Sequence, residues 1–324
     1  MQEIVHPIPE HVLRVLKRQH YAVVGLNTGV KLCDWLRKSL LDKGVCYKQD
    51  FYGIQSHRCL QMSPSVIWCT HRCIYCWRIQ SGDEPELRWK EYPFPESYDE
   101  PGFIVENAVK AQRQLISGYK PFANPRKYVE ALNPNQAAIS LSGEPTLYPL
   151  LGELISEFHK KHFTTFLVTN GTMPERLESL SELPTQLYIT LPAPSREVYL
   201  KTSRPIIRDG WERIQRSLEI MSTLQTRTVI RMTLTKGLNF RDPEGYAKLI
   251  EKANPMFVEL KAAMALGYAR RRGMEDRGML LHWEVRGFAE ELSKLIGYRV
   301  AGEKLPSRVV LLTRVKGDTK IPGL

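Results

Sequence analysis

The chain has 324 residues, 43% of them hydrophobic, with a formal net charge of +11 and a pI of about 9.3. This length accommodates one barrel-sized domain or two smaller ones, and the lack of any apolar run of about 18 residues excludes a membrane-spanning helix. The first residues lack the features of a secretory signal, so we expect a cytosolic protein. The positive charge is equally compatible with a generally basic protein and with a polyanionic partner such as nucleic acid.

The first 60 residues form a region of their own. Helical periodicity over residues 10–20 and 31–41 flanks an apolar run at residues 21–26. All six cysteines of the chain lie between Cys33 and Cys76. Since cytosolic thiols stay reduced, this confinement indicates metal ligation rather than disulfide bonds.

From residue 65 onward, short β-rich runs alternate with helical patterns, which predicts an α/β fold with a parallel sheet covered by helices. Strands are predicted at residues 65–69, 137–141, 164–168, 186–191, 228–234 and 256–260. Helices are predicted at residues 103–117, 148–161, 175–180, 210–224 and 243–253. Six such units are typical of a barrel or a partial barrel.

Polar or glycine-rich motifs follow the C-terminal end of every predicted strand. They are residues 69–76, Ser142-Gly143-Glu144-Pro145, Thr169-Asn170-Gly171, Pro192-Ala193-Pro194, residues 235–239 and residues 261–264. Any one loop can carry such residues without a function. Six of them in register on one face indicate an active site, because α/β barrels build theirs from these strand ends.

The motif with the most specific chemistry is the cysteine triad Cys69, Cys73 and Cys76, spaced C-x3-C-x2-C. Three thiolates on a tight loop can hold three irons of a 4Fe-4S cluster and leave the fourth iron open for a substrate or cofactor. Structural zinc, with His71 or His57 as the fourth ligand, is the alternative. Zinc sites usually combine two such knuckles, and no second one is present, so the spacing favours the iron-sulfur cluster.

The triad together with Ser142-Gly143-Glu144-Pro145 resembles the radical S-adenosylmethionine (SAM) enzymes, with Ser142 in place of the first glycine of their motif. The resemblance implies a partial six-fold (β/α) barrel, a 4Fe-4S cluster on the triad, and SAM bound to its open iron. We assign contacts with SAM to the following residues: Ser142, Gly143, Glu144, Pro145, Thr169, Asn170, Gly171 and Arg231.

A narrower resemblance covers most of the chain. Residues 46–54, 56–62, 69–77, 203–205, 231–239, 258–261, 267–270 and 306–312 resemble the 4-demethylwyosine synthases of tRNA wybutosine biosynthesis. The resemblance implies that Cys33, Cys46 and Cys59 hold a second 4Fe-4S cluster in an N-terminal extension, residues 1–62, ahead of a barrel with C-terminal additions, residues 63–324. The chain is similar to the single-module archaeal type, which implies a separate flavodoxin- or ferredoxin-like electron donor, and we expect a monomer.

The same resemblance implies a reaction. A 5′-deoxyadenosyl radical from SAM removes a hydrogen atom from the N1-methyl group of 1-methylguanosine, beside the anticodon of tRNA-Phe. The resulting radical adds to pyruvate, and loss of the pyruvate carboxylate carbon with ring closure gives 4-demethylwyosine. The family motif places its imine-forming lysine at Lys48, two residues after Cys46, with Lys261 and Lys236 at strand ends as alternatives.

Two further features bear on RNA. The arginine-rich segments are residues 196–216 and Arg270-Arg271-Arg272, for which phosphate contact and a solvated face are the two interpretations. The aromatic residues Trp77, Trp89, Tyr92 and Phe94 are candidates either for stacking on displaced bases or for packing in the core. The alternative functions are another radical SAM reaction with an auxiliary cluster, such as peptide maturation, and a non-catalytic zinc-stabilised RNA-binding module.

Overall fold

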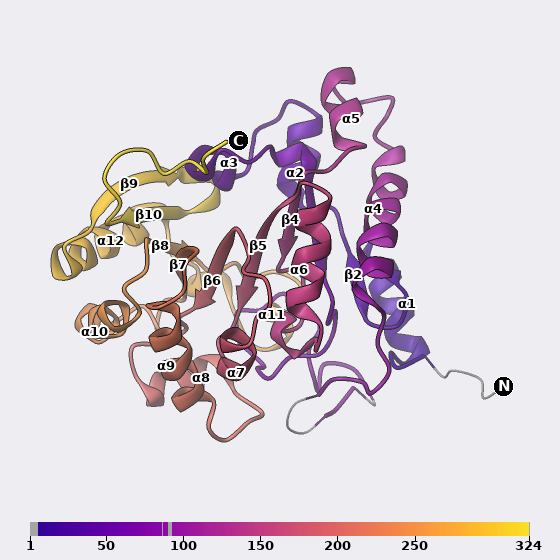
Figure 1. Ribbon diagram of the computed structural model, residues 1–324. Helices are drawn as coiled ribbons and strands as arrows, with labels where there is room; N and C mark the ends of the chain where they lie inside the picture. Colours follow the sequence, from indigo (N-terminus) through magenta and orange to yellow (C-terminus); the bar gives the residue numbers. More distant parts are fainter. Residues whose placement is uncertain (1–5, 86, 90–92, 324) are drawn as a thin grey trace.

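The computed structural model describes residues 6–85, 87–89 and 93–323, and within these residues it forms one ten-stranded sheet. The strand order is β1-β2-β3-β4-β5-β6-β7-β8-β10-β9 (Figure 1). The strands are β1 (Ala22–Val24), β2 (Thr28–Val30), β3 (Cys59–Ser63), β4 (Gln136–Ile139), β5 (Thr164–Thr169), β6 (Gln186–Thr190), β7 (Arg227–Leu234), β8 (Phe257–Ala262), β9 (Arg299–Lys304) and β10 (Val309–Thr313).

Six neighbouring strands, β3 to β8, are all parallel and build the partial barrel. Antiparallel strands extend the sheet at both edges, with β2 and β1 beyond β3 and with β10 and β9 beyond β8. The α/β partial barrel that the alternating pattern predicted is therefore confirmed.

Helices join the parallel strands and cover the outer face of the sheet (Figure 1). The helices of the described residues, including those that do not cover the sheet, are α1 (Glu10–Arg18), α2 (Asp34–Leu40), α3 (Tyr47–Tyr52), α4 (Pro101–Ser117), α5 (Pro125–Ala131), α6 (Leu151–Lys160), α7 (Pro174–Glu178), α8 (Arg196–Ser203), α9 (Gly210–Met221), α10 (Pro243–Ala253), α11 (Tyr268–Arg271) and α12 (His282–Ile296). Short 3-10 turns are η1 (Ser56–Arg58), η2 (Pro145–Leu147), η3 (Asp276–Gly278) and η4 (Leu305–Ser307). In the described residues, no helix has the length and apolar character needed to cross a membrane.

The two faces of the barrel strands bury different side chains. Outward-facing residues such as Leu167 and Leu187 join the large core formed with the covering helices. Inward-facing Phe166 and Phe257 pack instead on α3, and the Tyr52 ring lies 6.0 Å and 5.5 Å from theirs. Helix α3 of the N-terminal region therefore plugs the barrel at the end where the strands begin, and this apolar burial stabilises its position.

The first barrel strand is not where the sequence pattern placed it. The predicted strand at residues 65–69 is wrong, because the chain leaves β3 at Ser63 and turns at once. Asn27 fixes this turn, since its side chain donates to the carbonyl of Pro64 at 2.6 Å and its own carbonyl accepts from Val66 N at 3.1 Å. Strand β3 begins at Cys59 and ends at Ser63. The expected boundary between the N-terminal extension and the barrel, after residue 62, therefore falls inside this strand.

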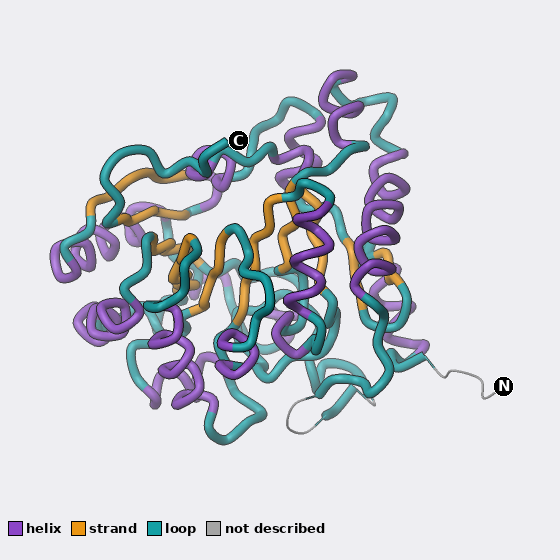
Figure 2. The backbone as a smooth tube through the Cα atoms, in the orientation of Figure 1, coloured by secondary structure: helices purple, strands orange, loops and turns teal. Residues whose placement is uncertain are grey.

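A long connection separates β3 from α4. Between Ser63 and Pro101 the described residues form only turns and loops, shown in teal in Figure 2. The remaining predicted strands and helices are confirmed to within a few residues of their ends. The chief omissions from the prediction are α5, α8, α12 and the hairpin of β9 and β10.

Candidate active site

The first cysteine triad lies on the long connection after β3. Cys69, Cys73 and Cys76 line one cavity of about 210 Å³ at the end of the barrel where the strands finish. Burial raises the pKa of all three thiols, to about 12 for Cys73, so the thiolate form is favoured only with a cation bound. Three half-buried thiols facing one cavity fit a metal cluster.

Arg272 braces the triad loop. Its guanidinium donates to the carbonyls of Cys73 at 3.3 Å, of Cys76, and of Arg78 at 2.5 Å. It also pairs with Asp83 at 2.6 Å, and both side chains of this pair are only 7% exposed. A planar guanidinium with several donors can hold three carbonyls at once, so Arg272 fixes the shape of the loop.

The segment after β4 packs tightly against the triad loop. Gly143 has φ of +71°, and a Cβ on it would lie 1.7 Å from the carbonyl oxygen of Ser65. Glu144 N donates to the carbonyl of Trp68 at 2.7 Å. The hydroxyl of Ser142 is buried and has no hydrogen-bond partner among the described residues, which leaves a polar atom free for a ligand.

Glu144 ties this segment to the end of β5. Its carboxylate accepts from the hydroxyl of Thr169 at 2.6 Å and from Asn170 N at 2.7 Å, while burial raises its pKa. The amide of Asn170 lies 3.7 Å from the sulfur of Cys69. Gly143, Glu144, Thr169, Asn170 and Arg231 line the same cavity as the first triad, whereas Ser142, Pro145 and Gly171 are not part of its lining.

The second triad assembles at the opposite end of the barrel. Cys33 precedes α2, Cys46 precedes α3, and Cys59 opens β3. Burial, followed by the charge of Cys33, raises the pKa of Cys46 to about 12 and also raises that of Cys59. Because the charge of Cys33 acts on both other thiols, the three lie in one small region where the strands begin.

In the described residues, neither triad is arranged around a single ion position. In the part of the chain that the structure describes, no three His, Cys, Asp or Glu side chains surround a common ion position. A cubane binds its thiolates through different irons and needs wider spacing than zinc does. His71 bonds to the hydroxyl of Tyr199 at 2.8 Å and His57 to Glu130 at 2.7 Å, so both histidines are occupied next to the triads.

Helix α3 carries Lys48 into the barrel. Its ammonium nitrogen lies 4.7 Å from the ring centre of Phe166 on β5 and 4.6 Å from that of Tyr188 on β6. Burial, together with the nearby charge of Arg231, lowers the pKa of Lys48 to about 8. A desolvated amine of this kind can act as a nucleophile near neutral pH.

A buried ion pair lies between Lys48 and the first triad's cavity. Arg231 donates to Glu259 at 2.9 Å and to the hydroxyl of Tyr47 at 2.9 Å. Glu259 also accepts from Tyr52 at 2.8 Å. Burial opposes ionisation of Glu259, but the charges of Arg231 and Lys48 outweigh it, and its pKa lies below the usual value. The pair joins α3 to the barrel wall.

Comparison with known proteins decides the family. The sequence model of the radical SAM superfamily matches residues 64–250, and that of wyosine base formation matches residues 252–314. S-adenosyl-L-methionine-dependent tRNA 4-demethylwyosine synthase of Pyrococcus horikoshii is 53% identical over 98% of this chain and 92% of its own length. The enzyme of the same name from Methanocaldococcus jannaschii is 40% identical over 94% and 96%. The chain belongs to this family of radical SAM enzymes.

Solved structures agree with that assignment. A structure of TYW1 with a lysine-pyruvate adduct bound has a TM-score of 0.85 and 39% identity, covering 97% of this chain and all of the other. A crystal structure of archaeal TYW1 has a TM-score of 0.78 and 37% identity, covering 97% and 99%. The predicted family and enzyme class are therefore confirmed. The two alternative functions, peptide maturation and a zinc-stabilised RNA-binding module, are not supported by these matches. Membership in the family implies a 4Fe-4S cluster and SAM as cofactors.

The alternative lysines occupy different settings. Lys261 is half-buried, donates to the carbonyl of Ser307 at 3.1 Å and lies 5.4 Å from the ring centre of Tyr47. Lys236 is half exposed and pairs with Glu284 at 2.7 Å, away from the barrel interior. Lys48 and Lys261 are therefore the two lysines, among those weighed from the sequence, that reach the interior.

Sequence reasoning missed Glu259, Tyr47 and Arg272. A glutamate in the otherwise apolar run F-V-E-L of β8 is the signal for Glu259, since an inward-facing charge on a buried strand requires a partner. The three arginines expected to meet phosphate are all paired. Arg270 binds Asp276 at 2.6 Å, Arg271 binds Glu84 at 3.2 Å, and Arg272 is buried on the triad loop.

The aromatic residues considered for base stacking differ in their exposure and contacts. Phe94 packs on Trp68 with ring centres 5.6 Å apart, and Trp89 donates to the carbonyl of Cys69 at 3.2 Å. Trp77 is 47% exposed, and the guanidinium of Arg78 lies 4.0 Å from the centre of its ring. Tyr92 lies outside the described residues.

Proposed function

We propose that this chain condenses the N1-methylguanosine beside the anticodon of tRNA-Phe with pyruvate to form 4-demethylwyosine, and that Lys48 holds the pyruvate. The observation that carries the assignment of Lys48 is its burial between Phe166 and Tyr188, inside a barrel whose other end carries the first triad. The lysine-pyruvate adduct in a TYW1 structure that matches this chain supports a lysine in that role.

Cys69, Cys73 and Cys76 would hold the 4Fe-4S cluster, which supplies the reductive cleavage of SAM when bound. The lining of that cavity supports SAM contacts from Gly143, Glu144, Thr169, Asn170 and Arg231. Glu144 has a fixed position because two neighbouring groups donate to it, and the unpartnered hydroxyl of Ser142 lies one residue from the lining. Pro145 and Gly171 would shape the loops without touching SAM.

The chemistry of Lys48 follows from its surroundings. The neutral amine attacks the C2 carbonyl of pyruvate, and a carbon–nitrogen double bond forms as the carbonyl oxygen leaves as water. The rings of Phe166 and Tyr188 keep other water from the imine carbon. Arg231 stays held by Glu259, so it adds positive charge near the pyruvate carboxylate without forming a covalent bond.

Cys33, Cys46 and Cys59 would hold a second 4Fe-4S cluster. The charges of Cys46 and Cys59 both act on the amine of Lys48, which supports a cluster site beside that lysine. Residues 1–62 would then serve as the extension that brings this cluster to the barrel. A single-chain enzyme in the cytosol, with a separate flavodoxin- or ferredoxin-like one-electron donor, completes the proposal.

The test is an anaerobic assay with SAM, pyruvate, a chemical reductant and tRNA-Phe that contains 1-methylguanosine, read by nucleoside mass spectrometry. The wild type should form 4-demethylwyosine. Lys48→Arg keeps the charge but cannot form an imine, so its product should fall below about one hundredth of the wild-type level. Lys236→Arg is the matched control and should retain activity. Product from Lys48→Arg at the control level would overturn the role of Lys48.

A further inference from the structure

A basic cavity on the outside of the barrel is not used by the chemistry described above. Its volume is about 660 Å³, and it lies where α4 meets the segments that lead into β4 and β5. Four cationic side chains line it, together with a single carboxylate. They are Arg58, Lys110, Arg113 and Lys161, with Glu106 as the carboxylate.

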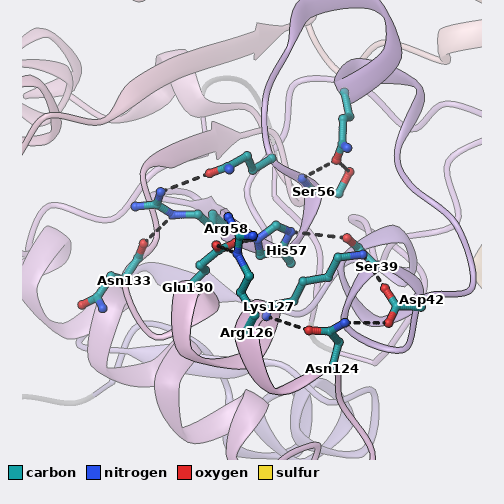
Figure 3. A network of polar contacts seen from close by, with 12 residues as sticks. Ser39, Asp42, Ser56, His57, Arg58, Asn124, Arg126, Lys127, Glu130 and Asn133 are labelled. Atoms are coloured by element: carbon teal, nitrogen blue, oxygen red, sulfur yellow. Dashed lines mark hydrogen bonds and ion pairs between the residues drawn. The ribbon is translucent and has the colours of Figure 1, made fainter.

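The two arginines are held in place but not neutralised. Arg113 donates to the carbonyl of Leu132 at 2.7 Å, and Arg58 donates to the carbonyl of Asn133 at 2.9 Å. Figure 3 shows Arg58 reaching Asn133 in this way. Carbonyl oxygens orient a guanidinium and leave its full charge, so two preorganised cations share one concave surface.

The carboxylates nearby are already occupied. Glu106 pairs with Lys110 at 2.7 Å, and Glu130 pairs with His57 and with Arg126, as Figure 3 shows. Among the described residues, none of the carboxylates pairs with Arg58, Arg113 or Lys161. The four cations and one anion leave the cavity with a net of three positive charges.

Other arginine-rich surfaces are neutralised in part by ion pairs. In the segment that contains α8 and α9, Arg213 pairs with Asp209 at 2.7 Å and Arg216 pairs with Glu178 at 2.8 Å. The arginines of α11 are also paired, as described above. Arg204 and Arg208 of the first segment are exposed, and no described carboxylate pairs with them. What distinguishes the cavity is therefore that its unpaired cations share one concave surface.

We infer that this cavity, defined by Arg58, Lys110, Arg113 and Lys161, binds the phosphate backbone of the tRNA substrate. Rigid guanidinium groups beside lysine ammonium groups are the usual recognition chemistry for RNA phosphates. A six-residue strand spans roughly 20 Å, so the cavity and the first triad lie at opposite rims of a short barrel. One helical arm of RNA is long enough to contact both. The inference rests on the proposed function only for the identity of the RNA.

The test is direct binding of tRNA-Phe containing 1-methylguanosine across a salt series, without SAM or reductant. Arg113→Glu combined with Lys161→Glu should weaken binding at least about tenfold at low salt and reduce the slope of log affinity against log salt by between about one and two. The matched control carries the same charge change on exposed lysines of α10 and α12, as Lys248→Glu with Lys294→Glu, and should stay within about twofold of the wild type.

The remaining outcomes decide the inference. The milder pair Arg113→Gln and Lys161→Gln should show a smaller loss in the same direction, and thermal unfolding and iron content verify that both pairs fold. Equal losses in the cavity variant and the control would show a general charge effect and overturn the site. Unchanged tRNA affinity with slower reduction by an acidic electron-transfer protein would assign the cavity to that donor and also overturn it. Because binding is measured without turnover, failure of the proposed function would appear separately, as an inactive wild type.

Discussion

Arg231 and Glu259 face each other across neighbouring strands of the barrel wall. They are register partners of β7 and β8, and their guanidinium and carboxylate meet at 2.9 Å. Glu259 is fully buried and Arg231 is 16% exposed, so the pair lies largely out of water. Since Arg231 also lines the first triad's cavity and donates to Tyr47 on α3, this pair connects the two ends of the barrel.

Breaking this pair should reduce stability strongly. Glu259→Ala leaves Arg231 buried without a counter-charge and should lower the free energy of unfolding by about 3–5 kcal/mol. Glu259→Gln keeps the acceptor for Tyr52 and should lower it by about 1–3 kcal/mol. Denaturant unfolding measures both values. The control is Glu219→Gln, which removes an exposed pair with Lys252 and should change stability by less than about 1 kcal/mol. Equal effects at Glu219 and Glu259 would contradict a connecting role.

Lys48 should be the residue that pyruvate modifies. Borohydride reduction with isotopically labelled pyruvate should trap one adduct per chain on the peptide that contains Lys48, because the buried amine has a lowered pKa and attacks the ketone. Peptide mass spectrometry locates the label. Lys261→Arg is the informative control, since Lys261 is the other candidate lysine that reaches the interior, and burial also lowers its pKa. A label on Lys261, or full labelling in Lys48→Arg, would refute the assignment.

Two clusters per chain should form, because two separate triads account for all six cysteines. Anaerobic reconstitution should give roughly eight irons and eight sulfides. Alanine at all three positions of either triad should leave about half of that iron. Loss of the first triad should abolish SAM cleavage, whereas loss of the second should remove product formation while SAM cleavage persists. A wild-type count near four irons per chain would correspond to one cluster and would contradict the prediction of a second.

The sequence predicted the barrel because its strands and helices alternate with strong periodicity, and it predicted that loops at strand ends gather around the first triad. It failed where the deciding contact joins distant residues. Asn27 turns the chain after Ser63, and nothing in the run at residues 65–69 reveals that contact. Arg272 was assigned to a solvent-facing patch, although its partner Asp83 lies 189 residues earlier and draws it into the interior.

Gly143 should tolerate no side chain. Its φ of +71° strains any other residue, and a Cβ would overlap the carbonyl of Ser65. Gly143→Ala should therefore lower the free energy of unfolding by at least about 2 kcal/mol and weaken SAM binding, as measured by calorimetry. Gly102→Ala is the matched control in α4, where a Cβ meets nothing within 4 Å, and it should raise stability by about 0.5–1 kcal/mol. Unchanged SAM affinity in Gly143→Ala would show that the loop of residues 142–145 does not contact SAM.

Arg272 should determine how firmly the triad loop holds iron. Its guanidinium fixes the carbonyls of Cys73 and Cys76, and Lys at this position can keep the ion pair with Asp83 but cannot hold the carbonyls in the same way. Each lost charge-assisted hydrogen bond is worth about 1.5–3 kcal/mol, so Arg272→Lys should release iron to a chelator roughly tenfold faster than the wild type. The second triad is replaced by alanine in all samples, so that only one cluster is measured. Arg271→Ala removes a neighbouring arginine that is 68% exposed and should leave the release rate unchanged. Equal rates for the two variants would show that Arg272 acts on the fold alone and not on the loop.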